Sequence, residues 1–199
     1  MSEEQVTGID EKSQAGGWRK EAWEIAKVLL VSLVIVLPIR YFLVQPFIVR
    51  GASMEPNFEN REYLIVDEAS YYFRAPKRGE AIVFRYPKDP RQFFIKRIIG
   101  LPGERVEVKD GQVRIINQDF PDGLILEESY LEPLERLTYP DISADLGSDQ
   151  FFVLGDNRDA SSDSRVWGPL EKRFITGRAL LRAWPLRQFG FVAGPILDY

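Results

Sequence analysis

Two residues in this sequence could perform chemistry together, a serine in a tight turn and a lysine in an apolar strand. Ser53 lies in "GASMEP" (51–56), a turn of small residues that follows the long hydrophobic stretch of the chain. Lys96 lies within "FFIKRIIG" (93–100). The chain contains no histidine and no cysteine, which excludes a Ser-His-Asp triad, a thiol nucleophile and the usual zinc sites. A serine nucleophile in this chain therefore needs another base.

A buried lysine can serve as that base, because burial disfavours the ammonium form and lowers the lysine pKa towards neutrality. Alternate residues of a strand share a face, so we expect Lys96 to lie on the same face as Phe94 and Ile98. A lysine that protects the edge of a sheet against aggregation would have the same spacing. The turn at Ser53 could equally be a linker that leaves a membrane helix. Periodicity alone leaves both alternatives open.

The apolar stretch 22–44, "AWEIAKVLLVSLVIVLPIRYFLV", is expected to form one membrane-spanning helix. Its uncharged centre, between Lys27 and Arg40, has twelve residues. As a helix it would measure about 18 Å, against about 30 Å of bilayer hydrocarbon. Trp23 and Tyr41 can lie at the two interfaces and the flanking basic side chains can extend to them, which makes a crossing feasible. A cleaved signal peptide, a buried core helix and an interfacial amphipathic helix are the alternatives.

After Pro56 the sequence predicts a mostly β domain, barrel-like or built of packed sheets. Asp110-Gly111 between two alternating runs is a strong signal for a hairpin. No long helical pattern follows the apolar stretch. The predicted strands cover residues 63–68, 80–86, 93–100, 105–116, 150–155 and 177–185.

Charge and hydropathy divide the chain into a polar tail (1–21), the apolar helix (22–44) and a β-rich domain (45–199). An acidic segment, 117–149, interrupts this domain. Its net charge is −8 and that of the whole chain is −4, so the rest of the chain carries +4. A mildly basic body suits an anionic membrane surface, although an ordinary solvated loop explains the acidic segment equally well. The basic residues form no stripe typical of nucleic-acid binding.

Four sequence blocks, in this order, closely resemble the bacterial type I signal peptidases. They are "GASMEP" (51–56), "RGEAIVF" (78–84), "KRIIGLPGE" (96–104) and "GDNRDASSDSRVWG" (155–168). Members of that family are membrane-anchored Ser-Lys endopeptidases that remove signal peptides from exported proteins. The resemblance covers roughly residues 22–184. Four ordered blocks, one of them fourteen residues long, are far more specific than a lone Ser-x-x-Pro.

The resemblance implies a catalytic role for two positions. Ser53 matches the family's nucleophile and Lys96 its general base, so a neutral Lys96 would accept the Ser53 proton during attack. Met54 matches a residue that lines the substrate cleft. The backbone N–H of Ser53 would stabilise the oxyanion of the tetrahedral intermediate.

Four further positions match residues that support the site in the family. They are Ser161, whose hydroxyl would orient the lysine amine, the ion pair of Asp163 and Arg165, and Asp156, an acid of the same loop. Two positions depart from the family. Asn57 stands where a threonine is usual, and Gly51 stands where some members carry a serine that assists the oxyanion hole.

The resemblance also implies the setting in which the chain works. The substrates would be preprotein signal peptides, bound as an added strand and cleaved after small residues of the Ala-x-Ala type, without a metal or cofactor. The chain would cross the plasma membrane once, with a cytoplasmic tail (1–21) and the catalytic domain on the outer face. The lipid bilayer and the secretion machinery would be its other partners, and nucleic acid would not.

Two other functions fit part of the pattern. A self-cleaving Ser-Lys repressor protease would carry a DNA-binding domain where this chain has its apolar stretch. A catalytically inactive, membrane-tethered β domain that binds partners is the second alternative. The departures at Asn57 and Gly51 leave that second alternative open.

Overall fold

The structure is a computed structural model that describes residues 17–42, 44–192 and 194 of the 199-residue chain. Contacts along the chain divide it into two compact units, Met1–Phe42 and Leu43–Tyr199. The boundary expected from the sequence, between residues 44 and 45, stays a prediction. Most of the predicted tail, residues 1–16, lies outside the described residues.

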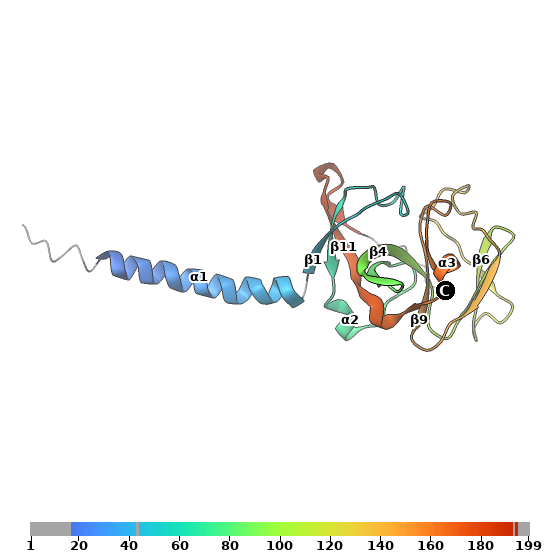
Figure 1. Cartoon of the computed structure of the whole chain (residues 1–199), viewed down its shortest axis with the longest axis horizontal. Coiled ribbons are helices and arrows are strands. Elements are labelled where there is room, and N and C mark those ends of the chain that lie inside the picture. Colours follow the sequence, from blue (N-terminus) through green and yellow to red (C-terminus); the bar gives the residue numbers. More distant parts are fainter. Residues whose placement is uncertain (1–16, 43, 193, 195–199) are drawn as a thin grey trace, which may run out of the picture. The chain divides into compact units, whose positions relative to one another are not determined.

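The first unit contains one helix, α1 (Gly17–Phe42), of 26 residues (Figure 1). It covers most of the predicted apolar segment 22–44. Its described apolar side chains, such as Val28 and Leu29, are exposed. Among the described residues, no helix combines the length and the apolar character needed to cross a bilayer. The transmembrane helix expected at 22–44 is therefore not confirmed.

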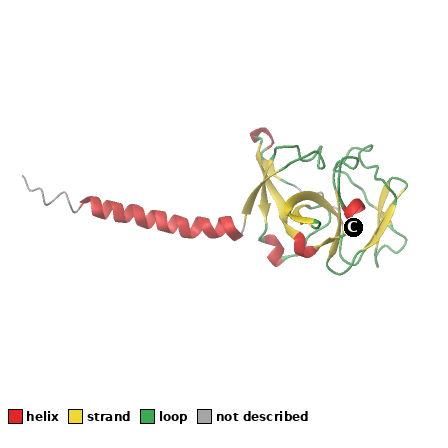
Figure 2. Ribbon diagram, in the orientation of Figure 1, coloured by secondary structure: helices red, strands yellow, loops and turns green. Residues whose placement is uncertain are grey.

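The second unit is built mainly of strands and loops (Figure 2), and all its strand pairs are antiparallel. The larger sheet has eight strands. Their order is β1 (Val44–Ile48), β2 (Tyr63–Asp67), β11 (Ile175–Trp184), β3 (Ala81–Tyr86), β4 (Asp89–Gly100), β9 (Gln150–Leu154) and β10 (Leu170–Glu171), with β12 (Gly190–Phe191) paired to β11.

The smaller sheet has four strands, in the order β7 (Leu124–Ile125), β6 (Gln112–Ile116), β5 (Arg105–Lys109) and β8 (Ile142–Asp145). The predicted hairpin at Asp110-Gly111 joins β5 to β6, and both turn residues have positive φ angles of 51° and 78°. Asp and Gly tolerate this left-handed conformation better than most residues, which explains why they stand there.

Short helices fill some of the connections between the strands. They are α2 (Ser70–Phe73), α3 (Ser164–Trp167) and the 3₁₀ turns η2 (Lys172–Phe174) and η3 (Leu186–Gln188). The prediction that no long helix follows the apolar segment is thus confirmed for the described residues.

Three clusters of buried apolar side chains hold the second unit together. One lies between the smaller sheet and the strands β4 and β9, around Val106, Ile115 and Phe152. A second cluster includes Ile82 and Ile98 of the larger sheet. The third contains residues next to Ser53 and is described below. Burial of this apolar surface is the main source of stability for the fold.

The predicted mostly β fold is found, in the form of packed sheets. Each predicted strand overlaps an observed one, and β4 begins four residues before the predicted start at Phe93. The order of the larger sheet begins at β1 and ends at β10, so these strands do not close into a barrel. The acidic segment 117–149 supplies β7 and β8 to the smaller sheet and is therefore more than a solvated loop.

Candidate active site

The turn that carries Ser53 is fixed by its neighbours on both sides. Gly51 has a φ angle of 91°, which side chains disfavour, and its N–H donates a hydrogen bond to Asn60 Oδ1. After the serine, the N–H of Phe58 donates to the Met54 carbonyl at 2.8 Å. The side chains of Met54 and Phe58 are 0% and 2% exposed and belong to the third apolar cluster. The half-buried Ser53 is therefore held on a rigid turn.

Lys96 lies directly opposite this turn. Its Nζ donates a hydrogen bond to Ser53 Oγ at 2.7 Å and another to the Ile95 carbonyl at 2.9 Å. The lysine is 4% exposed, and its Nζ lies 5.5 Å from the centre of the Phe94 ring. The expected shared face with Phe94 is thus confirmed. A lysine that protects a sheet edge would be solvated, so its burial excludes that alternative.

Burial lowers the pKa of Lys96 from 10.5 to about 8, although the negative charges of Asp163 and Asp156 oppose this shift. Water solvates an ammonium better than a protein interior does, so removal from water favours the neutral amine. At pH 7 about a tenth of the molecules then hold a neutral lysine, compared with a negligible fraction at the reference pKa. The neutral amine has the lone pair that a general base requires.

Asp156 binds a neighbour of Lys96 in the sequence. Arg97 Nε and Nη2 donate to the two carboxylate oxygens at 2.8 and 2.5 Å, and both residues are almost fully buried. Asn57 Nδ2 also donates to Asp156 at 3.0 Å and to the Tyr130 carbonyl at 3.0 Å. Asn57 therefore ties the serine turn to the loop of Asp156 and to the acidic segment.

Asp163 and Arg165 form the predicted ion pair, with Arg165 Nη2 at 2.8 Å from Asp163 Oδ2. Asp163 also accepts a hydrogen bond from the Gly155 N–H at 3.0 Å and caps the helix α3 through the Arg165 N–H. Burial alone would raise the pKa of Asp163, but the hydrogen bonds and the charge of Arg165 bring it below 3.8. The carboxylate is thus held ionised, where it opposes the loss of the Lys96 charge.

Gly155 permits a close approach between two parts of the site. A Cβ atom at this position would lie 2.4 Å from the Ser53 carbonyl oxygen and 2.2 Å from Ser161 Oγ. Two residues after Gly155, the Asn157 N–H donates a hydrogen bond to the same Ser53 carbonyl oxygen at 3.2 Å. The loop that begins at Gly155 therefore packs directly against the backbone of the serine turn.

Ser161 is brought to the site but does not bind the lysine. Its buried Oγ contributes to lowering the pKa of Asp163, and the Lys96 amine donates to other groups. The expected contact that would orient the amine is therefore not present. Among the described residues, the Ser53 N–H also lacks an acceptor, which leaves it available for an oxyanion.

A cavity of about 650 Å³ opens beside the Ser53 and Lys96 pair. Its lining includes the residues 47–53, which run from β1 into the serine turn, and the residues 91–96 of β4, and it is rich in apolar side chains. Met54 does not line it, contrary to expectation. The turn after Ser53 directs the Met54 side chain into the apolar cluster, where it is fully buried.

Some contacts of the site were not predicted from the sequence. The clearest case is Asp156, whose partners are Arg97 and Asn57. The buried ion pair of Arg158 with Glu128 is another; it fixes the acidic segment to the loop 155–168. An arginine in an apolar strand was a visible signal for Arg97. Nothing in the spacing could have paired Glu128 with a residue thirty positions away.

Comparison with known proteins assigns the chain to a family. The family described as "Signal peptidase, peptidase S26" matches residues 22–184. The chain belongs to this family. "Probable signal peptidase I-1" of Synechocystis sp. is 38% identical over 84% of this chain and 87% of its own length. "Signal peptidase I" of Leptolyngbya laminosa is 38% identical over 85% of this chain and 83% of its own length. "Signal peptidase I P" of Bacillus subtilis subsp. natto is 34% identical over 80% of this chain and 88% of its own length.

Membership of the signal peptidase family makes the chain a serine peptidase. The resemblance inferred from the four sequence blocks is confirmed, with the same bounds of 22 and 184. Membership also implies substrates with signal peptides and association with a membrane.

Proposed function

We propose that Ser53 and Lys96 form the catalytic dyad with which this signal peptidase removes signal peptides from exported preproteins. The observation that carries the proposal is the 2.7 Å contact between Ser53 Oγ and a buried lysine whose pKa is lowered to about 8. A serine hydroxyl and a neutral amine at this distance are placed for proton transfer. The pair also borders a cavity in which an extended peptide can lie.

The reaction follows from this geometry in two stages. Neutral Lys96 accepts the Ser53 proton as Ser53 Oγ attacks the scissile carbonyl, and the free Ser53 N–H stabilises the oxyanion. The lysine ammonium then gives its proton to the departing amine, which leaves an acyl-enzyme on Ser53. Neutral Lys96 next takes a proton from water, which attacks the ester. As the ester bond breaks, the lysine ammonium returns this proton to Ser53 Oγ and the signal peptide is released.

The substrate is expected to bind by strand addition to β4. The pairing of β4 with β9 begins at Arg97, so the residues before it are unpaired on that side in the described chain. These unpaired residues line the cavity together with the segment 47–53. A peptide strand can therefore pair with the backbone there, while the site selects small side chains before the scissile bond.

The helix α1 is proposed to anchor the enzyme. Its exposed side chains are mostly apolar from Val28 to Val36, and such a surface needs cover by lipid or protein. With Trp23 and the flanking basic residues at the interfaces, we propose a single crossing of the plasma membrane. The tail would then lie in the cytoplasm and the β unit on the outer face, close to the bilayer and the secretion machinery.

The inactive β domain remains the competing function. The two departures that left it open have structural roles, since Asn57 joins the serine turn to Asp156 and Gly51 has a φ angle that favours glycine. Neither departure removes a group of the proposed dyad. The contact between Ser53 and Lys96 therefore favours the enzyme.

The deciding experiment is cleavage of a purified preprotein by the purified full chain in detergent, followed by sequencing of the product N-terminus. We expect one cut after an Ala-x-Ala type site. Ser53→Ala should be folded and inactive, because it removes one half-buried hydroxyl. Processing by folded Ser53→Ala at the wild-type rate would contradict the dyad.

A further inference from the structure

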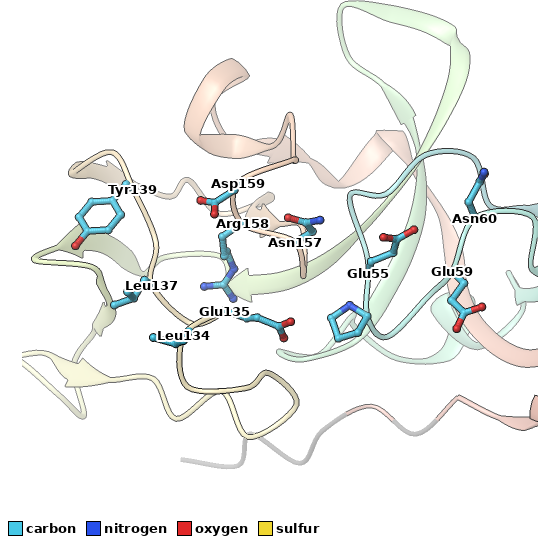
Figure 3. A pocket seen from close by; sticks show the side chains of 11 residues that line it. Glu55, Glu59, Asn60, Leu134, Glu135, Leu137, Tyr139, Asn157, Arg158 and Asp159 are labelled. Atoms are coloured by element: carbon cyan, nitrogen blue, oxygen red, sulfur yellow. The ribbon is translucent and has the colours of Figure 1, made fainter.

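A second cavity lies on the other side of the serine turn. It has a volume of about 870 Å³ and is lined by three segments (Figure 3). These are the turn residues 55–60, part of the acidic segment from Leu134 to Tyr139, and the loop 157–159. In Figure 3 the Glu135 side chain extends from the acidic segment towards the serine turn. No step of the proposed reaction uses this cavity.

Ser53 stands between the two cavities. The chain up to Ser53 lines the first cavity, together with Lys96. The chain from Glu55 onwards lines the second, together with Asn157, whose N–H donates to the Ser53 carbonyl. A polypeptide cut at Ser53 must continue on both sides of the scissile bond. The apolar first cavity suits the signal peptide, so the second lies where the chain after the bond passes.

The two cavities carry opposite charge. The first is lined by the basic residues Arg50, Arg91 and Lys96 and by no acid. The second is lined by four acids and one base, Arg158. Arg158 is 4% exposed and its charge is matched by Glu128, so it does not offset the acids. The acids are Glu55, Glu59, Glu135 and Asp159.

These acids are largely free to bind a ligand. Glu55 and Asp159 have no ion-pair partner among the described residues. Glu135 accepts one long hydrogen bond, 3.4 Å, from the Glu132 N–H. Glu59 lies 3.8 Å from Arg187 and is the least available of the four. Three carboxylates therefore face the second cavity without a matching charge.

We propose that the second cavity binds the first residues of the mature protein, just after the scissile bond, and favours basic side chains there. The inference rests on the proposed function and adds a specificity to it. The mixed lining suits such a segment, because Pro56, Leu134 and Leu137 can contact the aliphatic part of a lysine or arginine. The carboxylates attract its charge. They disfavour acidic mature segments by the same mechanism.

The test compares two preproteins that have the same signal peptide and the same cleavage site. They differ only in the residues that follow the first mature residue, which are Lys-rich in one preprotein and Glu-rich in the other. The full chain in detergent should cleave the Lys-rich preprotein with the higher kcat/KM. In Glu55→Gln/Glu135→Gln/Asp159→Asn this preference should fall about three- to tenfold at low salt, the size expected for a few partly exposed charge pairs. Asp119→Asn/Asp122→Asn is the matched control, with acids of the same segment outside the cavity, and should keep the preference.

Equal kcat/KM of the wild type for both preproteins, or an unchanged preference in the triple variant, would overturn the inference while leaving the proposed function intact. A wild type that cleaves neither preprotein would instead overturn the proposed function. If the triple variant does not fold, Asp159→Lys decides alone, since Asp159 is exposed and forms no ion pair. It should shift the preference towards the Glu-rich preprotein, and an unchanged preference in a folded Asp159→Lys protein would overturn the inference.

Discussion

At the scale of single residues, the site depends on the charge of Lys96. The negative charges of Asp163 and Asp156 favour the ammonium, yet burial outweighs them and lowers the lysine pKa to about 8. Lys96 therefore lowers the free energy of unfolding, because a charged lysine is disfavoured at this buried position.

We expect Lys96→Met to be inactive and more stable than the wild type at pH 7. The lysine pKa falls from 10.5 in the unfolded chain to about 8 in the fold, a shift that corresponds to at most about 3 kcal/mol. Between pH 8 and pH 10.5 the lysine is mostly protonated in the unfolded chain and mostly neutral in the folded chain. The destabilisation by Lys96 is therefore complete below pH 8 and is relieved as the pH rises towards 10.5.

Denaturant unfolding at pH 7 and at pH 10 measures this effect, and the gain from Lys96→Met should shrink at the higher pH. The same pKa should appear in catalysis. The wild-type kcat/KM should rise with pH with a midpoint near 8, since the neutral amine is the active form. Lys96→Met that is less stable than the wild type at pH 7 would show that the ammonium supports the fold.

Some of the residue chemistry was visible in the sequence and some was not. The absence of histidine and the apolar strand around Lys96 made this lysine a candidate base, and only the resemblance to the signal peptidases paired it with Ser53; the two side chains are in contact. Met54 illustrates the limit, because a residue beside a nucleophile can face the cavity or the core. Backbone hydrogen bonds within the turn determine which, and the sequence does not display them.

At the scale of elements, the loop 155–168 holds the serine turn in place. Gly155→Ala should reduce kcat/KM strongly, because its Cβ would collide with the Ser53 carbonyl and with Ser161. A displacement of the nucleophile by about 1 Å can reduce the rate about 10²-fold. Gly190→Ala is the matched control, since a Cβ there meets no other atom within 4 Å. Equal kcat/KM for Gly155→Ala and Gly190→Ala would show that the close approach is not required.

Asp163 has a structural role in the same loop. Asp163→Ala removes the acceptor of the Gly155 N–H, the cap of α3 and the partner of Arg165. A buried charge left alone costs about 3–5 kcal/mol, so thermal stability and activity should fall together. Because the Asp163 pKa is lowered in the fold, this stabilisation is present above pH 4 and is lost as the pH falls through the folded pKa.

Thermal unfolding and cleavage assays of Asp163→Ala, measured side by side, test this role. A lower melting temperature with proportionate loss of activity supports it. Loss of activity at an unchanged melting temperature would point to a direct part in the chemistry.

The elements show where local pattern is sufficient and where it is not. Alternation and the Asp110-Gly111 turn predicted the strands of the β unit, since both are local signals. The short strands β1, β7, β8, β10 and β12 were missed because two to five residues carry little periodicity. The strand order could not be predicted either, because β11 pairs with β2 and β3, which lie far from it in the sequence.

At the scale of the whole molecule, the residues proposed for catalysis and the helix proposed as an anchor fall in two separate compact units. Every residue of the proposed dyad and its supporting network lies in the second unit. The first residue that this unit needs is Val44, since β1 pairs with β2 from Val44 to Ile48. The units should therefore be separable between residues 43 and 44.

A chain that begins at Val44 should keep the melting temperature of the β unit and cleave a short soluble peptide at the wild-type rate. It should process a preprotein embedded in vesicles about 10²-fold more slowly than the full chain, because the anchor raises the local concentration of enzyme at the bilayer. Parallel assays on the soluble peptide and on the vesicles separate this effect from damage to the site. Equal loss on both substrates would show that α1 supports the fold, whereas undiminished processing in vesicles would mean that the β unit needs no anchor.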